Sequence, residues 1–221
     1  MKHIVVDLEM NPIKFDSPAR SIGTNEVIEI GAVMLDEELN EVSAFRTYVK
    51  PELNDGITKK IRKLTGITDE MVANAPNFNT AFRMFTSWCN GTGDEIIIHA
   101  WSDSDYYQIQ KEIQIKAYEI SEDEKFITDN EWDDFQEKFD SRLNFESQLK
   151  LSTALDMAGI NFEGNEHDAL DDARNTAELL KVFSDQALFD KTLKLIEEVM
   201  TPSNISCSLG SLFDFSSLMD A

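Results

Sequence analysis

The sequence has few cysteines, few basic residues and no long apolar run, and each shortage excludes a class of protein. Its two cysteines, Cys89 and Cys207, form neither a disulfide framework nor a zinc-binding spacing, so we expect a reducing, cytoplasmic location. No apolar stretch approaches the ~20 residues of a membrane-spanning helix, and the first residues lack the pattern of a signal peptide. We expect no membrane segment.

Basic residues are also scarce, with 20 Lys and Arg against 42 Asp and Glu, which gives a formal net charge of −22. A protein of this charge does not hold a polyanion through bulk electrostatics, so nucleic-acid binding would need metal ions and a local basic patch. One such patch exists at residues 59–63 (Lys-Lys-Ile-Arg-Lys), and it is either a guide for a phosphate backbone or a solvated helix face. The acid-rich stretch 119–140 is expected to be a solvated surface.

The length of 221 residues and the 42% apolar content suit one domain with a sizeable core, expected over residues 1–200 and followed by a tail over 201–221. Periodicity predicts an α/β fold with a mixed central sheet flanked by helices. The first three strands lie close together in the sequence, which favours an antiparallel meander. Gly31, inside the second strand, indicates a bulge or a close backbone approach. The predicted strands are His3–Glu9, Glu26–Leu35, Val42–Val49 and Glu95–His99.

Helical periods and capping residues predict the remaining elements. Phe78, Phe82, Phe85 and Trp88 recur at helical spacing and form either a core stripe or a base-stacking platform. Residues 117–130 are expected to form a loop, and residues 132–139 fit a short strand or a helix equally well. The other predicted helices are Thr58–Leu64, one capped by Thr68, Tyr106–Lys116, Ser147–Met157, Asp168–Phe183 and Phe189–Met200.

Two carboxylates interrupt the first apolar strand, at Asp7 and Glu9. Side chains at positions i and i+2 of a strand point to the same face, so the two would leave a buried strand close together and repel each other. A divalent cation between them would remove that cost, and hard oxygen ligands suit Mg²⁺ or Mn²⁺. The alternative is an edge-of-strand Asp and a Glu that opens a turn.

Two further acidic sites follow. His167 precedes Asp172 by five residues, and we expect both near the N-terminal end of a helix, whose dipole disfavours a protonated imidazole. After Trp101, either Asp103 or Asp105 stands where a strand opens onto a helix, the place at which α/β sheets usually bind ligands. The spacing alone leaves both aspartates open.

Together these motifs resemble the DEDDh 3′→5′ exonucleases of the DnaQ-like superfamily, whose fold is ribonuclease H-like. The resemblance extends from residue 4 to about residue 180, and it is closest to the subgroup of small-RNA and histone-RNA trimming enzymes and sporulation-inhibitor-type bacterial exonucleases. Besides the acidic sites, the similar blocks, in the order of the family, are Glu29-Ile-Gly-Ala-Val33, Tyr48-Val-Lys-Pro51, Leu64-Thr-Gly-Ile-Thr68 and the run from His167 to Ala177.

The resemblance implies a chemistry and a substrate. It implies a 3′→5′ exonuclease that hydrolyses RNA or single-stranded DNA from the 3′ end with two Mg²⁺ or Mn²⁺ ions and releases nucleoside 5′-monophosphates. It favours Asp105 over Asp103. The implied metal ligands are Asp7, Glu9, Asp105 and Asp172, the implied base is His167, and Leu8, Met10 and Trp101 are the implied substrate contacts.

Two alternatives differ from this activity. A catalytically silent nuclease-fold module that binds nucleic acid or protein would keep the fold but show no turnover. The Phe-rich tail over 201–221 would support that reading. A metal-dependent phosphatase of other esters would share the acids but show no dependence on substrate chain length.

Overall fold

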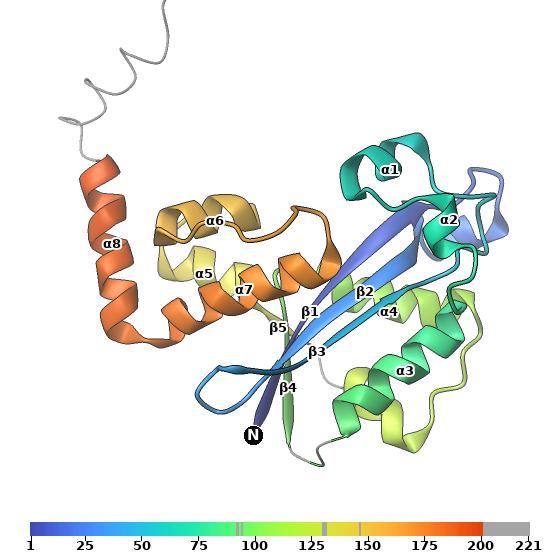
Figure 1. Cartoon of the computed structure of the whole chain (residues 1–221), viewed down its shortest axis with the longest axis horizontal. Helices are drawn as coiled ribbons and strands as arrows, with labels where there is room; N and C mark the ends of the chain where they lie inside the picture. Colours follow the sequence, from blue (N-terminus) through green and yellow to red (C-terminus); the bar gives the residue numbers. More distant parts are fainter. Residues whose placement is uncertain (92, 94, 130–131, 146, 201–221) are drawn as a thin grey trace, which may run out of the picture.

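The computed structural model describes residues 1–200 except 92, 94, 130–131 and 146, so the predicted tail and Cys207 lie outside it. Within the described residues the sheet has five strands in the order β3-β2-β1-β4-β5 (Figure 1). The pairs β1–β2 and β2–β3 are antiparallel, while β1–β4 and β4–β5 are parallel. The predicted mixed sheet and its antiparallel meander are therefore confirmed. The strands are β1 (Lys2–Pro12), β2 (Asn25–Leu35), β3 (Glu41–Tyr48), β4 (Ile96–Ala100) and β5 (Asp133–Asp134).

Helices cover both faces of the sheet (Figure 1). One face carries α3 (Phe78–Asn90) and α4 (Ser104–Ile115). On the other side α7 (Ala169–Ser184) lies along the sheet, with α5 (Phe135–Arg142) and α6 (Leu151–Ala158) beside it, and α8 (Gln186–Met200) packs against α6 and α7. Shorter elements are α1 (Lys59–Thr65), α2 (Asp69–Val72) and the 3₁₀ helices η1 (Pro18–Ser21) and η2 (Glu122–Ile127). None of the helices in the described ranges combines the length and apolar character needed to cross a bilayer.

The alternation of side chains along β1 divides the core into two layers. Ile4, Val6 and Leu8 pack with α3 and α4, whereas Val5 packs with α5, α6 and α7. Asp7 and Glu9 have the same parity as Val5, so their side chains leave β1 on the side that α7 covers. The position of α7 therefore decides what the two carboxylates meet.

The aromatic stripe of α3 belongs to the core. Phe78, Phe82 and Phe85 are fully buried against the sheet. Trp88 packs at the edge of the same cluster, and its indole Nε1 donates to the Ser43 hydroxyl at 2.9 Å. The structure thus supports core packing rather than a base-stacking platform.

One helical prediction needs correction, and the structure decides one segment that the sequence left open. The helix expected from Ser147 begins only at Leu151, after an extended N-cap residue, Lys150. The Leu149 N–H donates to Asp140 Oδ2 at 3.2 Å, and the Leu149 carbonyl accepts from the side chain of Trp101. The undecided segment 132–139 contains both a two-residue strand, β5, and the start of α5.

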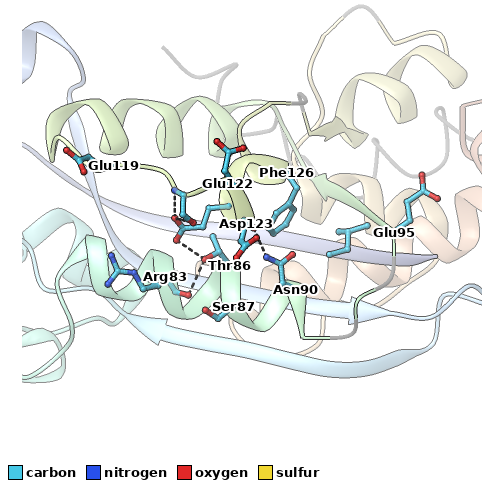
Figure 2. Close-up of a pocket in the computed structure, with 12 residues that line it drawn as sticks. Arg83, Thr86, Ser87, Asn90, Glu95, Glu119, Glu122, Asp123 and Phe126 are labelled. Atoms are coloured by element: carbon cyan, nitrogen blue, oxygen red, sulfur yellow. Dashed lines mark hydrogen bonds between the residues drawn. The ribbon is translucent and has the colours of Figure 1, made fainter.

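The loop expected over 117–130 contains η2, and its acids are not all solvated. Glu124 is buried and accepts hydrogen bonds from the Tyr118 hydroxyl at 2.6 Å and the Thr86 hydroxyl at 3.2 Å. A capping box with Ser121 begins the 3₁₀ helix. Figure 2 shows the cavity of about 850 Å³ between α3 and η2, which Glu119, Glu122 and Asp123 also line.

Gly31 marks a close approach between β2 and α7. A Cβ built on Gly31 would lie 2.2 Å from the carbonyl carbon of Ala169, the first residue of α7. The register shifts of the sheet fall at Glu9/Met10 and Met34/Leu35, not at Gly31, so of the two predicted alternatives the structure shows the close approach. Gly31 lies directly opposite Asp7 across the β1–β2 pair, so this contact brings α7 next to the β1 carboxylates.

We expect Gly31→Ala to destabilise the protein by about 3 kcal/mol or more and to lower any activity of the adjacent site, because backbone atoms of α7 would have to move. Chemical denaturation measures the loss. Gly91→Ala is the matched control, since its added Cβ would meet the Trp88 carbonyl oxygen at 3.3 Å, and it should cost far less. Equal stability of Gly31→Ala and the wild type would contradict the close packing of α7.

Candidate active site

Three elements bring the predicted acidic residues together. Asp7 and Glu9 leave β1 on one face, and their partners across β2 are Gly31 and Glu29. The missing side chain at Gly31 leaves room for the first turn of α7 to approach. The third element is α4, whose first turn supplies Asp105.

Helix α4 supplies Asp105 rather than Asp103. Asp105 lies in the first turn, is only 5% exposed and accepts a hydrogen bond from the backbone N–H of Leu8. Asp103 occupies the N-cap position, is exposed and makes no side-chain capping bond. The structure therefore brings Asp105 to β1 and leaves Asp103 facing solvent.

The start of α7 supplies His167 and Asp172. Asp168 caps the helix, and its Oδ1 accepts from the Asp171 N–H at 3.2 Å. His167 therefore precedes the helix, and its expected place on the helix is wrong. It is exposed and adopts a left-handed backbone with φ of 65°. Its backbone N–H donates to Asp172 Oδ2 at 2.9 Å, which folds the turn back onto the helix.

The side chains from β1 and α7 converge closely enough for shared ligand binding. One ligand atom from each of Glu9, His167 and Asp172 lies within 4.8 Å of the other two. Asp7 interacts electrostatically with both Asp105 and Asp172, which links the group to α4. Four carboxylates and one imidazole from distant parts of the chain thus form one cluster.

Burial and mutual repulsion make this cluster unfavourable when it is fully ionised. Burial, followed by the charge of Asp105 and then that of Asp172, raises the pKa of Asp7 well above its usual range. Burial and the charge of Asp172 raise the pKa of Glu9 to about 9. Burial also raises the pKa values of Asp105 and Asp172 to about 7, although backbone N–H groups donate to both carboxylates.

No lysine or arginine in the described ranges forms an ion pair with these four carboxylates. Buried carboxylates without a cationic partner are costly, and hard oxygen donors are what Mg²⁺ and Mn²⁺ prefer. The donor set therefore fits divalent cations. Asp7, Glu9, Asp105 and Asp172 are the residues that would hold them.

A cavity of about 530 Å³ opens beside the cluster and is lined by Asp7, Trp101, His167 and Asp172. Trp101 is 9% exposed, and its indole Nε1 donates to the Leu149 carbonyl at 3.2 Å. Of the other predicted contacts, Leu8 is 4% exposed and packs in the core, while Met10 is partly exposed at the edge of the core. The side chain of Leu8 therefore offers little surface to a substrate.

Sequence reasoning missed a network that joins the start of α7 to the sheet. Arg46 on β3 donates from Nε to Glu29 Oε1 at 2.6 Å and from Nη2 to Asp168 Oδ2 at 2.6 Å. Glu29 is fully buried and also accepts from the Ala169 N–H at 3.4 Å. Glu29 lies two residues before Gly31, on the same face of β2, and this spacing could have indicated that Glu29 is close to the site. No local pattern in the sequence marks Arg46.

The exonuclease family model RNase_T matches residues 4–180. The chain is 30% identical over 182 residues to ERI1 exoribonuclease 2 of Xenopus laevis, covering 71% of this chain and 25% of that protein. It is 27% identical over 180 residues to 3′-5′ exoribonuclease 1 of Rattus norvegicus, covering 77% of this chain and 48% of that one. The chain therefore spans less than half the length of either relative.

The fold is also similar to that of a solved nuclease domain. The crystallographic structure of the nuclease domain of 3′hExo, a DEDDh family member, bound to rAMP superposes with a TM-score of 0.70 at 22% identity, covering 84% of this chain and 92% of that one. The mixed sheet with helices on both faces is the ribonuclease H-like architecture that the motifs implied. Because the family model matches most of the chain, the protein belongs to the RNase_T exonuclease family, within the DnaQ-like superfamily that its DEDDh motifs resemble.

Proposed function

We propose that this chain is a metal-dependent 3′→5′ exonuclease that hydrolyses RNA or single-stranded DNA from the 3′ end and releases nucleoside 5′-monophosphates. The observation that carries the proposal is the convergence of four carboxylates from β1, α4 and α7 with an exposed imidazole beside them. Acid pairs of this kind recur in sites for phosphodiester hydrolysis, where two cations flank the reacting phosphorus.

Asp7, Glu9, Asp105 and Asp172 would hold two Mg²⁺ or Mn²⁺ ions. Bound there, the ions lower the pKa of a water molecule and stabilise the charge that develops on the leaving oxygen. Asp7 would contribute to the binding of both ions, since the charges of Asp105 and of Asp172 both act on its carboxyl group. The backbone bonds from Leu8 and His167 hold Asp105 and Asp172 in place.

His167 would act as the general base. The residue is exposed, and one of its ring nitrogens lies within 4.8 Å of a carboxylate oxygen of Glu9 and of one of Asp172, so the imidazole stands beside the carboxylates without being enclosed by them. A ring nitrogen in this place can accept the proton of an attacking water molecule. A positioned base of this kind contributes about 10²–10⁴ to the rate.

The cavity next to the carboxylates supports a place for the terminal nucleotide. Trp101 lines it, and Met10 lies partly exposed beyond Glu9. The exposed basic patch at residues 59–63 on α1 would guide the phosphate backbone, with the Arg62 guanidinium already paired to Asp69. The two relatives described above are named as exoribonucleases, which favours RNA as the preferred substrate.

Nucleotide release from oligonucleotides labelled at the 3′ end tests this function. With Mg²⁺ or Mn²⁺ we expect labelled 5′-monophosphates, and with EDTA we expect none. Binding without release in either condition would support the catalytically silent module, and release that does not depend on chain length would support a phosphatase. Matched RNA and DNA oligomers in the same assay establish the preferred sugar.

We expect His167→Ala to lower kcat by about 10²–10⁴ while Mg²⁺ affinity, measured by calorimetry, changes little, because a base is removed and the carboxylates remain. His3→Ala, which changes a histidine at the other end of β1, should leave both quantities near the wild-type values. Loss of Mg²⁺ binding in His167→Ala would instead make His167 a metal ligand.

We expect Asp7→Asn to be more stable than the wild type in EDTA and less stabilised by added Mg²⁺. The site carboxylates keep protons in the folded chain that the unfolded chain has already lost, so the free energy of unfolding should fall as pH rises from about 4 to about 9. Asparagine at position 7 removes one of the repelling charges, so the free energy of unfolding should fall less steeply with pH. Added Mg²⁺ should stabilise the variant less than the wild type, because the variant lacks one of the carboxylates that would bind the ion.

Thermal unfolding at several pH values, with EDTA or Mg²⁺, measures both effects. Asp103→Asn is the matched control, because Asp103 is exposed two residues before Asp105, and it should behave as the wild type. An apo stability of Asp7→Asn below that of the wild type at pH 8 would show that repulsion does not govern the cluster.

A further inference from the structure

The turn that carries His167 is held in an unfavourable backbone conformation. A left-handed backbone costs a residue with a side chain about 1–2 kcal/mol, and it persists only where the surroundings impose it. The backbone bond from His167 to Asp172 Oδ2 accounts for one constraint. The next residue, Asp168, provides the other, because it fixes the point at which α7 begins.

Asp168 is anchored to the sheet through Arg46. Its Oδ1 caps α7, and its Oδ2 accepts from Arg46 Nη2 at 2.6 Å. The same guanidinium donates to Glu29 at 2.6 Å, and Glu29 in turn accepts from the Ala169 N–H. These bonds close a ring that includes the two residues directly after His167, so the position of Arg46 sets the position of the turn.

Arg46 also pairs with two carboxylates outside the predicted metal-binding cluster, Glu29 and Asp168. Glu29 and Asp168 both add to the charge that acts on Glu9. The Arg46 guanidinium pairs with both and is 36% exposed, while the Glu29 side chain is fully buried. Removing the guanidinium would leave the buried Glu29 without its cation, which favours movement of the start of α7 away from the sheet.

We propose that Arg46 is a positioning residue for His167: it holds the turn at residues 164–168 so that the imidazole stays beside Glu9 and Asp172. The inference rests on the proposed exonuclease function for its kinetic consequence. Arg46 does not contact the four metal-binding carboxylates, so its loss should affect kcat through His167 and leave the binding of oligonucleotide largely unchanged.

The chain contains a matched control. Arg174 also bridges α7 and β3, with Nη2 3.1 Å and Nε 3.2 Å from the Glu41 carboxylate. This pair is exposed on both sides and lies on the helix beyond the first turn. Arg174→Met therefore removes an arginine–carboxylate pair between the same two elements without touching Asp168.

We expect Arg46→Met to lower kcat by about 10- to 100-fold with KM within about threefold of the wild type, since a small displacement of a catalytic group costs up to about 10²-fold. Arg46→Lys should be intermediate, because an ammonium cannot bridge both carboxylates in the manner of the planar guanidinium. Arg174→Met should keep the wild-type kcat. Equal kcat values for Arg46→Met and Arg174→Met would overturn the proposal.

Double variants separate positioning from a general structural effect. Asp168→Asn keeps a capping side chain but loses the ion pair, so combining it with Arg46→Met should cost no more than the larger single effect. In a His167→Ala background Arg46→Met should have no further effect on kcat. A full further loss in that background would mean that Arg46 acts through another group.

Hydrogen exchange supplies a readout that does not require activity. Arg46→Met should speed exchange of the backbone amides over residues 165–172, and Arg174→Met should not. If Arg46→Met fails to fold, Arg46→Met/Glu29→Gln removes the unpaired buried charge and is compared with Glu29→Gln alone. Unchanged exchange in the turn would refute the anchoring role, whereas absence of nuclease activity in the wild type would refute the proposed function but not the anchoring.

Discussion

The repulsion among the carboxylates at the end of β1 is the constraint on which the rest of the structure depends. Asp7 and Glu9 share a face because strand side chains alternate, and Asp105 and Asp172 are brought against them by α4 and α7. In the described part of the chain, no lysine or arginine side chain pairs with these four carboxylates. Hydrophobic packing of both helices against the sheet holds the charges together, and a divalent cation would convert the cost into binding energy.

The surrounding structure is arranged so that this packing is possible. Gly31 allows the backbone of α7 to approach β2, and Glu29 receives the first N–H of that helix. Arg46 pairs with Glu29 and Asp168, two carboxylates whose negative charge acts on Glu9, and so offsets part of that charge. Together, Gly31, Glu29 and Arg46 fix the position of the start of α7 on the sheet.

Local pattern was enough to predict most of the sheet and the pair of acids on β1, whereas the choice of Asp105 and the full set of acids came from the resemblance to a family. Alternation placed Asp7 and Glu9 on one face, and Gly31 indicated the close approach that α7 makes. Position relative to a helix start was harder to predict. His167 lies before α7 rather than on it, because the capping bond of Asp168 begins the helix one residue later than the expected start.

What local pattern could not supply were interactions between distant segments. Just before α6, the backbone of Leu149 bonds to the side chains of Asp140 and Trp101, and Trp101 is 48 residues away in the sequence. Arg46 reaches an aspartate 122 residues away. Such pairs depend on the assembled fold, and a single sequence gives no period or spacing that marks them.

The site also joins an early and a late part of the chain, since β1 supplies Asp7 and α7 supplies Asp172. Contacts of such long sequence separation form late in folding, because the entropy of loop closure opposes them. Without a cation, the packing of α7 on the sheet has to offset the like charges that its first turns bring to β1. A bound ion would remove that opposition and tie a late helix of the domain to the first strand, which should make local release of α7 from the sheet rarer.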